Sequence, residues 1–238
     1  MQSHVERVVR AFLEATDGAL GSAYTAVLYG SGARLEHVPD HSDLNLLLIV
    51  PSLTPEVLVR LDGSFESLAG RTRTPPLLFS KAEWDCAGDV FPIEITDMQV
   101  SRGVLRGADP VADLVVSKAD LRRALERELR GKLLRLRQGY ALFHSSPTDL
   151  GQVGIRSSST IAVLLRAAIA LSGHAPPGET VAALRAAGER MGFDGGAIAK
   201  WYEARRGGTA PTVDEFVPYL AAVEAAVQYV DQFHVGGD

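Results

Sequence analysis

The chain has 238 residues, of which 46% are apolar and 22% are charged. These values are typical of globular proteins and exclude wholesale disorder and fibrous repeats. Its 24 basic and 29 acidic residues give a net charge of −5, which argues against a protein coated in nucleic acid. Cys86 is the single cysteine, so the chain has no internal disulfide bond.

The sequence carries no recognisable signal for secretion or membrane insertion. Its first ten residues lack a basic stretch followed by an apolar stretch. The apolar run from Leu44 to Val50 is broken by Asn45 and is far shorter than the roughly 18 residues needed to span a bilayer. We therefore expect a cytoplasmic protein with no membrane partner.

The first half of the chain contains the segments that predict strands. They are rich in aliphatic, β-branched or aromatic residues, and several end at glycine or proline. The predicted strands are residues 24–29, 44–50, 76–79 and 91–97. Apolar residues at helical spacing predict a helix from Val5 to Leu13 and another from Pro55 to Leu68. This pattern predicts an α/β or α+β domain with about four strands.

From Ser117 onward the apolar residues recur at helical spacing. Ser117 is the predicted N-cap of a long helix whose leucines share one face as far as Tyr140. Further helices are predicted over 161–171, 181–191, 197–204 and 216–233. The charge changes at the same point: residues 1–116 carry a net −7 and residues 117–238 a net +2. We therefore expect an α/β domain over 1–116 and a helical bundle over 117–238.

The turn after the first predicted strand and the start of the second carry the most informative residues. The first strand ends in Gly30-Ser31, where backbone N–H groups and a hydroxyl can approach a phosphate without an obstructing side chain. The second strand begins with Asp43 and Asn45, which alternate with leucines and so project from one face.

A third acidic residue on a neighbouring strand would complete an oxygen-rich cluster. Glu94 lies between two isoleucines of the fourth predicted strand and is the first candidate, with Asp97 as the alternative. Clustered oxygen ligands suit Mg²⁺, a hard cation that also binds phosphate oxygens. An ordinary hairpin is the competing interpretation, because glycine, serine and aspartate dominate turns for structural reasons.

This arrangement resembles the nucleotidyltransferase superfamily, whose members share a DNA polymerase β-like palm with a mixed sheet. Residues 30–34 match its Gly-Ser-x-Ala-Arg opening, and residues 42–44 match the entry to its Asp-x-Asp pair. The resemblance covers roughly the first half of the chain. A basic helix followed by a helical bundle is also similar to small members such as the aminoglycoside nucleotidyltransferases.

The resemblance implies a transfer of a nucleoside monophosphate from an NTP to a hydroxyl of a small molecule or protein, with Mg²⁺ or Mn²⁺ as the cofactor. The implied catalytic and metal-binding residues are Asp43, Asn45 and Glu94. The expected nucleotide-binding residues are Gly30, Ser31, Arg34, Arg123 and Arg127. The last two lie on the basic helix after Ser117, where residues 117–137 carry a net +5. A merely solvated basic face is the alternative for that helix.

The sequence departs from the family pattern at two positions. Asn45 stands where the pattern has a second aspartate, so the cluster loses a negative charge, and Leu35 replaces the usual glycine after Arg34. Loss of that charge would weaken the binding of two adjacent cations, which repel each other. The alternative function is therefore a degenerate member that binds a nucleotide or a partner without turnover. An antitoxin-like module is disfavoured because this chain carries its own helical bundle.

Overall fold

The computed structural model describes residues 2–34, 36, 44–70, 72, 74–207 and 211–235. The chain divides into two compact units. The first, here called the sheet unit, comprises residues 1–91 and 97–115; the second, the helical unit, comprises residues 92–96 and 116–238.

The sheet unit is built on a mixed sheet, in which four strands lie in the described residues. In chain order they are β1 (Thr25–Tyr29), β2 (Asn45–Val50), β3 (Leu77–Ser80) and β4 (Arg102–Arg106). Their order across the sheet is β3-β2-β1-β4. Strand β1 is antiparallel to β2 and β4, whereas β2 and β3 are parallel. The first three predicted strands are confirmed within one residue at each end.

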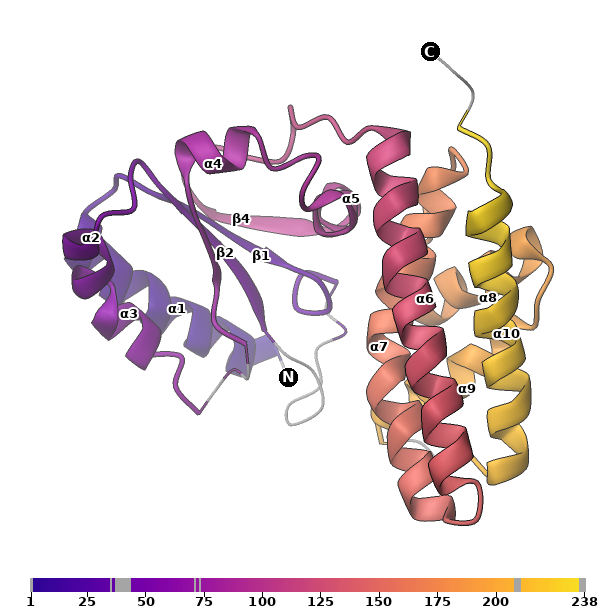
Figure 1. Ribbon diagram of the computed structural model, residues 1–238. Helices are drawn as coiled ribbons and strands as arrows, with labels where there is room; N and C mark the ends of the chain where they lie inside the picture. The colour runs from indigo at the N-terminus through magenta and orange to yellow at the C-terminus, as the bar shows by residue number, and fades with distance from the viewer. Residues whose placement is uncertain are drawn as a thin grey trace. The chain divides into compact units, whose positions relative to one another are not determined.

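Three helices cover one face of this sheet (Figure 1). They are α1 (Gln2–Leu20), α2 (Pro55–Arg60) and α3 (Asp62–Glu66). Even-numbered strand residues such as Ala26, Leu46 and Leu48 pack with Phe12 of α1 in one buried cluster. Because strand side chains alternate, odd-numbered residues such as Asn45 face the other side of the sheet, where α4 (Lys81–Asp85) lies.

The predicted strand at 91–97 is wrong, because this segment forms helix α5 (Pro92–Val100). Its isoleucines and threonine favour strands, but Pro92 occupies the first helical turn, where proline is well tolerated. Residues 92, 93 and 95–98 are all buried, so the helix shows no amphipathic period that a sequence pattern could reveal. The Thr96 hydroxyl donates to the Pro92 carbonyl at 2.6 Å, a bond typical of threonine inside a helix.

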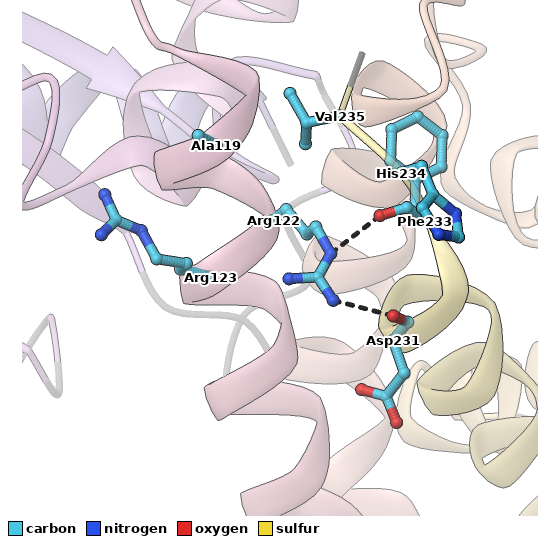
Figure 2. A pocket seen from close by; sticks show the side chains of 7 residues that line it. All are labelled: Ala119, Arg122, Arg123, Asp231, Phe233, His234 and Val235. Atoms are coloured by element: carbon cyan, nitrogen blue, oxygen red, sulfur yellow. Dashed lines mark hydrogen bonds between the residues drawn. The ribbon is translucent and has the colours of Figure 1, made fainter. Parts of the chain in front are cut away.

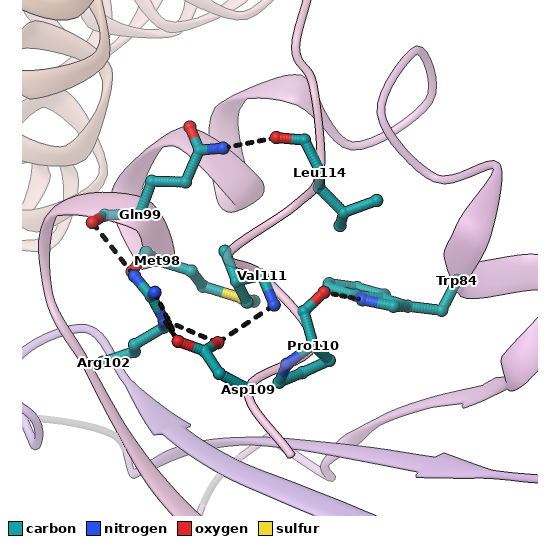
Figure 3. Close-up of polar contacts among 8 residues, drawn as sticks. All are labelled: Trp84, Met98, Gln99, Arg102, Asp109, Pro110, Val111 and Leu114. Atoms are coloured by element: carbon teal, nitrogen blue, oxygen red, sulfur yellow. Dashed lines mark hydrogen bonds and ion pairs between the residues drawn. The ribbon is translucent and has the colours of Figure 1, made fainter.

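Strand β4, which the sequence did not predict, is followed by a connection that is fixed to the sheet unit by side chains (Figure 3). Arg102 bonds both carboxylate oxygens of Asp109 at 2.5–2.9 Å. The Trp84 indole donates to the Pro110 carbonyl at 2.9 Å, and the Gln99 amide donates to the Leu114 carbonyl at 2.8 Å. Residues 109–114 therefore hold a defined path against α4 and α5.

The helical unit contains five long helices in the described residues. They are α6 (Lys118–Phe143), α7 (Pro147–Leu171), α8 (Thr180–Met191), α9 (Gly195–Arg205) and α10 (Val213–Gln232). The predicted cap is confirmed, since the Ser117 hydroxyl accepts from the Asp120 N–H at 3.0 Å. The predicted leucine face of α6 is also confirmed, because it is buried against the other helices.

Helix α7 is long and apolar enough to cross a membrane by length and composition, although the sequence patterns predicted no such segment. Of its most apolar stretch, 56% is buried inside the protein, as in the core helix of a bundle. The buried Arg166 on this helix donates to the Pro177 carbonyl at 2.6 Å. These features indicate that α7 is the central helix of this unit.

Close packing between α7 and α9 depends on a glycine. Trp201 of α9 is buried, with 1% of its surface exposed, against the backbone of Gly154. A Cβ placed on Gly154 would lie 2.3 Å from a ring carbon of Trp201, far inside van der Waals contact. By contrast, Gly151, one turn earlier on the same helix, has no atom within 4 Å of its Cβ position.

We predict opposite effects for alanine at these two glycines. Gly154→Ala should lower the free energy of unfolding by about 1–3 kcal/mol, because the indole has to move. Gly151→Ala should raise it by up to about 1 kcal/mol, because alanine favours the helix and meets no neighbour. Urea denaturation measures both values. Equal effects at the two positions would contradict the packing argument.

Candidate functional site

The turn after β1 lies directly against the first residue of β2. Tyr29 and Asn45 are paired in register, and Gly30 follows Tyr29 with a φ of +68°, in the left-handed region that favours glycine. A Cβ placed on Gly30 would lie 2.6 Å from the side-chain nitrogen of Asn45. The structure therefore brings the predicted phosphate turn and Asn45 together.

Backbone hydrogen bonds close this turn. The Arg34 N–H donates to the Gly30 carbonyl at 3.2 Å, and the Glu36 N–H donates to the Ser31 carbonyl at 2.9 Å. A Cβ on Gly32 would lie 3.1 Å from Leu28 and 3.2 Å from Leu44, so the turn also packs tightly on the strands. Within the described part of the chain, neither the Ser31 hydroxyl nor the Asn45 amide makes a hydrogen bond. Both groups are therefore available to a ligand.

The predicted acidic cluster is only partly described. Asp43 lies outside the described residues, as do His37 and His41 of the same connection. Glu94 was expected on a strand facing Asp43 across the sheet. That geometry is wrong, because Glu94 is an exposed residue in the first turn of helix α5. Its predicted role as a metal ligand stays a prediction, and no group of three His, Cys, Asp or Glu side chains suited to a metal occurs among the described residues.

Arg34, predicted to bind the nucleotide, is instead held by buried carboxylates. Its Nη1 lies 3.2 Å from both carboxylate oxygens of Asp97, and its Nε lies 3.3 Å from Oε2 of Glu36. The exposed fractions of these side chains are 6% for Arg34, 5% for Asp97 and 8% for Glu36. Asp97, the alternative metal ligand, is thus an ion-pair partner of Arg34. Glu36 was not among the residues predicted for the site, and its only signal in the sequence is its position two residues after Arg34.

The basic face of α6 divides into two parts. Arg130 and Arg137 pair with Asp231 and Glu224 of α10, each at 2.5 Å, and so join the two helices. The predicted nucleotide-binding residues on this helix, Arg123 and Arg127, are the more exposed, with 72% and 75% of their side chains accessible. Their pairing is local, to Asp120 and Glu128 of α6 itself.

Arg123 also lines a hollow of about 540 Å³ between the start of α6 and the end of α10 (Figure 2). Its neighbour Arg122 reaches across, donating to the carbonyls of Asp231 at 2.7 Å and Phe233 at 2.9 Å, whereas Arg123 extends away from them. Those bonds satisfy carbonyl groups at the end of α10. The Ser117 hydroxyl and then Arg123 lower the pKa of Asp120, so this acid stays ionised beside Arg123.

No protein-family model and no curated protein matches the chain. Among solved structures, it is similar to the spectinomycin adenyltransferase AAD(9) from Enterococcus faecialis, determined with ATP and spectinomycin. The TM-score is 0.61 at 12% identity, and the match covers 95% of this chain and 99% of that chain. The chain therefore has a nucleotidyltransferase-type fold, a mixed sheet combined with a helical region. The predicted fold class is confirmed.

The contact between Gly30 and Asn45 predicts a costly alanine substitution. Gly30→Ala should destabilise the protein by about 1–2 kcal/mol through its left-handed backbone and by about 0.5–1.5 kcal/mol more because the side-chain amide of Asn45 has to rotate aside. Gly21 is the matched control, because its φ is +65° and no atom lies within 4 Å of its Cβ position.

Gly21→Ala should therefore show only the backbone cost. Adding Asn45→Ala to Gly30→Ala should recover the difference, since it removes the obstructing amide. Urea denaturation of these three variants and the wild type measures these terms. Equal losses for Gly30→Ala and Gly21→Ala would mean that Asn45 does not press on the turn.

Proposed function

We propose that the protein binds a nucleoside triphosphate with Mg²⁺ or Mn²⁺ at the Gly30-Ser31 turn and transfers the nucleoside monophosphate to a hydroxyl of a small molecule or protein. The observation that carries the proposal is the contact between this turn and Asn45, two residues after Asp43. A nucleotide phosphate needs hydrogen-bond donors, such as those of the turn, and its cation needs oxygen ligands close by, such as the side chains at residues 43 and 45. The fold likeness to an adenyltransferase determined with ATP supports the same class of substrate.

In this reaction an acceptor hydroxyl oxygen forms a bond to the α-phosphorus, the bond to the β-phosphate oxygen breaks, and pyrophosphate leaves. The hydroxyl proton passes to a base or to solvent. The cation would neutralise charge on the phosphate groups. The chain's own contribution at the turn is positioning: left-handed Gly30 keeps side chains out of the way, and the Ser31 hydroxyl can donate to a phosphate oxygen.

The metal ligands proposed on β2 and just before it are Asp43 and Asn45. An amide oxygen and a carboxylate would both be suitable ligands for Mg²⁺, a hard cation that prefers oxygen. Asn45 supports this role because its amide has no hydrogen bond to another described residue. With one charge fewer than an Asp-x-Asp pair, the two residues suit one cation better than two closely spaced cations.

A second candidate function is nucleotide binding without turnover. Asn45 is the feature that favours it, because a neutral ligand stabilises the cation less than a carboxylate does. The two candidates share the binding site and differ in whether labelled nucleotide reaches an acceptor. Turnover by the wild-type protein is therefore the measurement that separates them.

We predict that Asp43→Ala abolishes nucleotide transfer and weakens Mg²⁺-dependent ATP binding by at least about tenfold, since it removes the ionised ligand. Asp89→Ala is the control: Asp89 is an exposed acid of the sheet unit outside the proposed site, and its loss should leave both values unchanged. Transfer of labelled nucleotide and calorimetric titration with ATP and Mg²⁺ provide the readouts. Unaltered ATP binding in Asp43→Ala would exclude it as a ligand.

Asn45→Asp tests the same site by adding a charge instead of removing one. The site is common to both candidate functions. It adds a negative charge with almost no change in volume, so Mg²⁺ should bind more tightly in the presence of saturating nucleotide. Calorimetric titration measures the affinity. Identical affinities of the wild type and Asn45→Asp would show that residue 45 does not contact the cation, under either candidate function.

Arg123 and Arg127 stay proposed nucleotide-binding residues. Replacing either by alanine should weaken ATP binding, and added salt should reduce the difference from wild type, because exposed charges are screened. Arg137→Ala is the matched control on the same helix, since Arg137 is already paired with Glu224. Unchanged ATP affinity in both alanine variants would show that these arginines are merely solvated and do not bind the nucleotide.

A further inference from the structure

The polar groups of the Gly30 turn fall into two classes. The Ser31 hydroxyl and the Asn45 amide make no hydrogen bond within the described part of the chain. Arg34, four residues after Gly30, has its guanidinium engaged by two carboxylates from its own protein. Polar groups without a hydrogen bond therefore lie close in this turn to an arginine whose side chain is already ion-paired.

The surroundings of Arg34 leave little room for a phosphate. Only 6% of its side chain is exposed, and Nη1 and Nε are directed to Asp97 and Glu36. The two carboxylates together outweigh the single positive charge of Arg34. A phosphate that displaced either one would break an ion pair whose two side chains are buried, which is unfavourable.

The same arginine belongs to the turn through its backbone. Its N–H closes the turn on the Gly30 carbonyl at 3.2 Å, and the next backbone bond joins Glu36 to the Ser31 carbonyl at 2.9 Å. Its side chain reaches Asp97, 63 residues away in the sequence, in the part of α5 that belongs to the sheet unit. Arg34 thus connects the Gly30-Ser31 turn, through its backbone, to α5, through its side chain.

We propose that Arg34 and Asp97 are positioning residues: their buried ion pair holds the Gly30-Ser31 turn in the geometry that binds phosphate, and Arg34 does not contact the nucleotide. The proposal rests on the proposed function for its ligand, a nucleoside triphosphate. It replaces the direct nucleotide contact expected of Arg34 from the sequence. A turn displaced by even about 1 Å can lose a hundredfold in activity, so the pair can matter greatly without touching substrate.

A double-mutant cycle distinguishes positioning from direct contact. Asp97→Asn and Arg34→Gln should each weaken Mg²⁺-ATP binding by about ten- to a hundredfold, and the double variant should be no weaker than either single variant. Added salt should leave these ratios unchanged. A direct contact predicts another pattern: Asp97→Asn keeps or improves ATP affinity, because it releases the guanidinium, and the loss in Arg34→Gln shrinks with salt. That pattern would overturn the proposal.

Hydrogen exchange in the nucleotide-free protein provides a test that does not need the proposed function. Each variant should speed the exchange of the Arg34 and Glu36 amides by at least about tenfold, while amides of β1 and α1 keep their wild-type rates. Asp17→Asn is the matched control. It disrupts a pair with Arg106, which lies in register with Ala26 near the far end of β1, and should leave the turn amides unchanged.

The outcomes separate the two proposals. If the wild type binds no ATP but both variants speed the exchange of the turn amides alone, the proposed function fails and the positioning role of the Arg34–Asp97 pair stands. If the turn amides exchange at wild-type rates in both variants, the positioning proposal is wrong whatever the ATP data show. Should Arg34→Gln fail to fold, Arg34→Lys replaces it, since lysine keeps the charge but lacks the planar guanidinium.

Discussion

The candidate site depends on the left-handed backbone at Gly30. At this position the chain leaves β1, and a hydrogen atom occupies the place where any side chain would collide with the Asn45 amide. Register pairing of Tyr29 with Asn45 puts the turn against the first residue of β2, and the absence of a side chain at Gly30 permits the close approach. The Arg34–Asp97 pair then secures the other end of the turn on α5. The left-handed backbone of Gly30 and the buried Arg34–Asp97 pair are therefore the two features that shape the proposed phosphate-binding turn.

Much of the fold was predictable because its elements have strong local signals. Strands β1 and β2 are apolar runs that end near Gly30 and Pro51, and α6 has both a serine cap and a leucine face. The failures have physical causes. Helix α5 is buried on most sides, so its apolar residues show no helical period, and its β-branched residues favour a strand. Strand β4 is short and contains a glycine and two arginines, which hide its pairing with β1.

The site was predictable where it depends on neighbours in sequence and unpredictable where it depends on distant contacts. Register pairing of two adjacent strands was enough to bring Gly30 near Asn45. Arg34 was different, because an arginine in a phosphate-turn motif suggests a ligand contact. Only the folded chain reveals that Asp97, on an element wrongly expected to be a strand, occupies its guanidinium. The position of an acidic residue in sequence does not reveal which cation it neutralises.

These charges bear on how an anion could bind at the turn. Arg34 is balanced by two buried carboxylates, and Asn45 brings no charge, so these described residues offer a phosphate no uncompensated positive side chain. In the proposed function, attraction there would come from backbone N–H groups, the Ser31 hydroxyl and a bound cation, of which the cation carries the largest charge. Nucleotide binding at such a turn should therefore depend more steeply on Mg²⁺ than binding at a turn whose arginine reaches the phosphate. If the protein binds a nucleotide as proposed, the aspartate-to-asparagine departure and the buried arginine would act in the same direction, since both would increase the share of the binding energy that a single divalent cation has to supply.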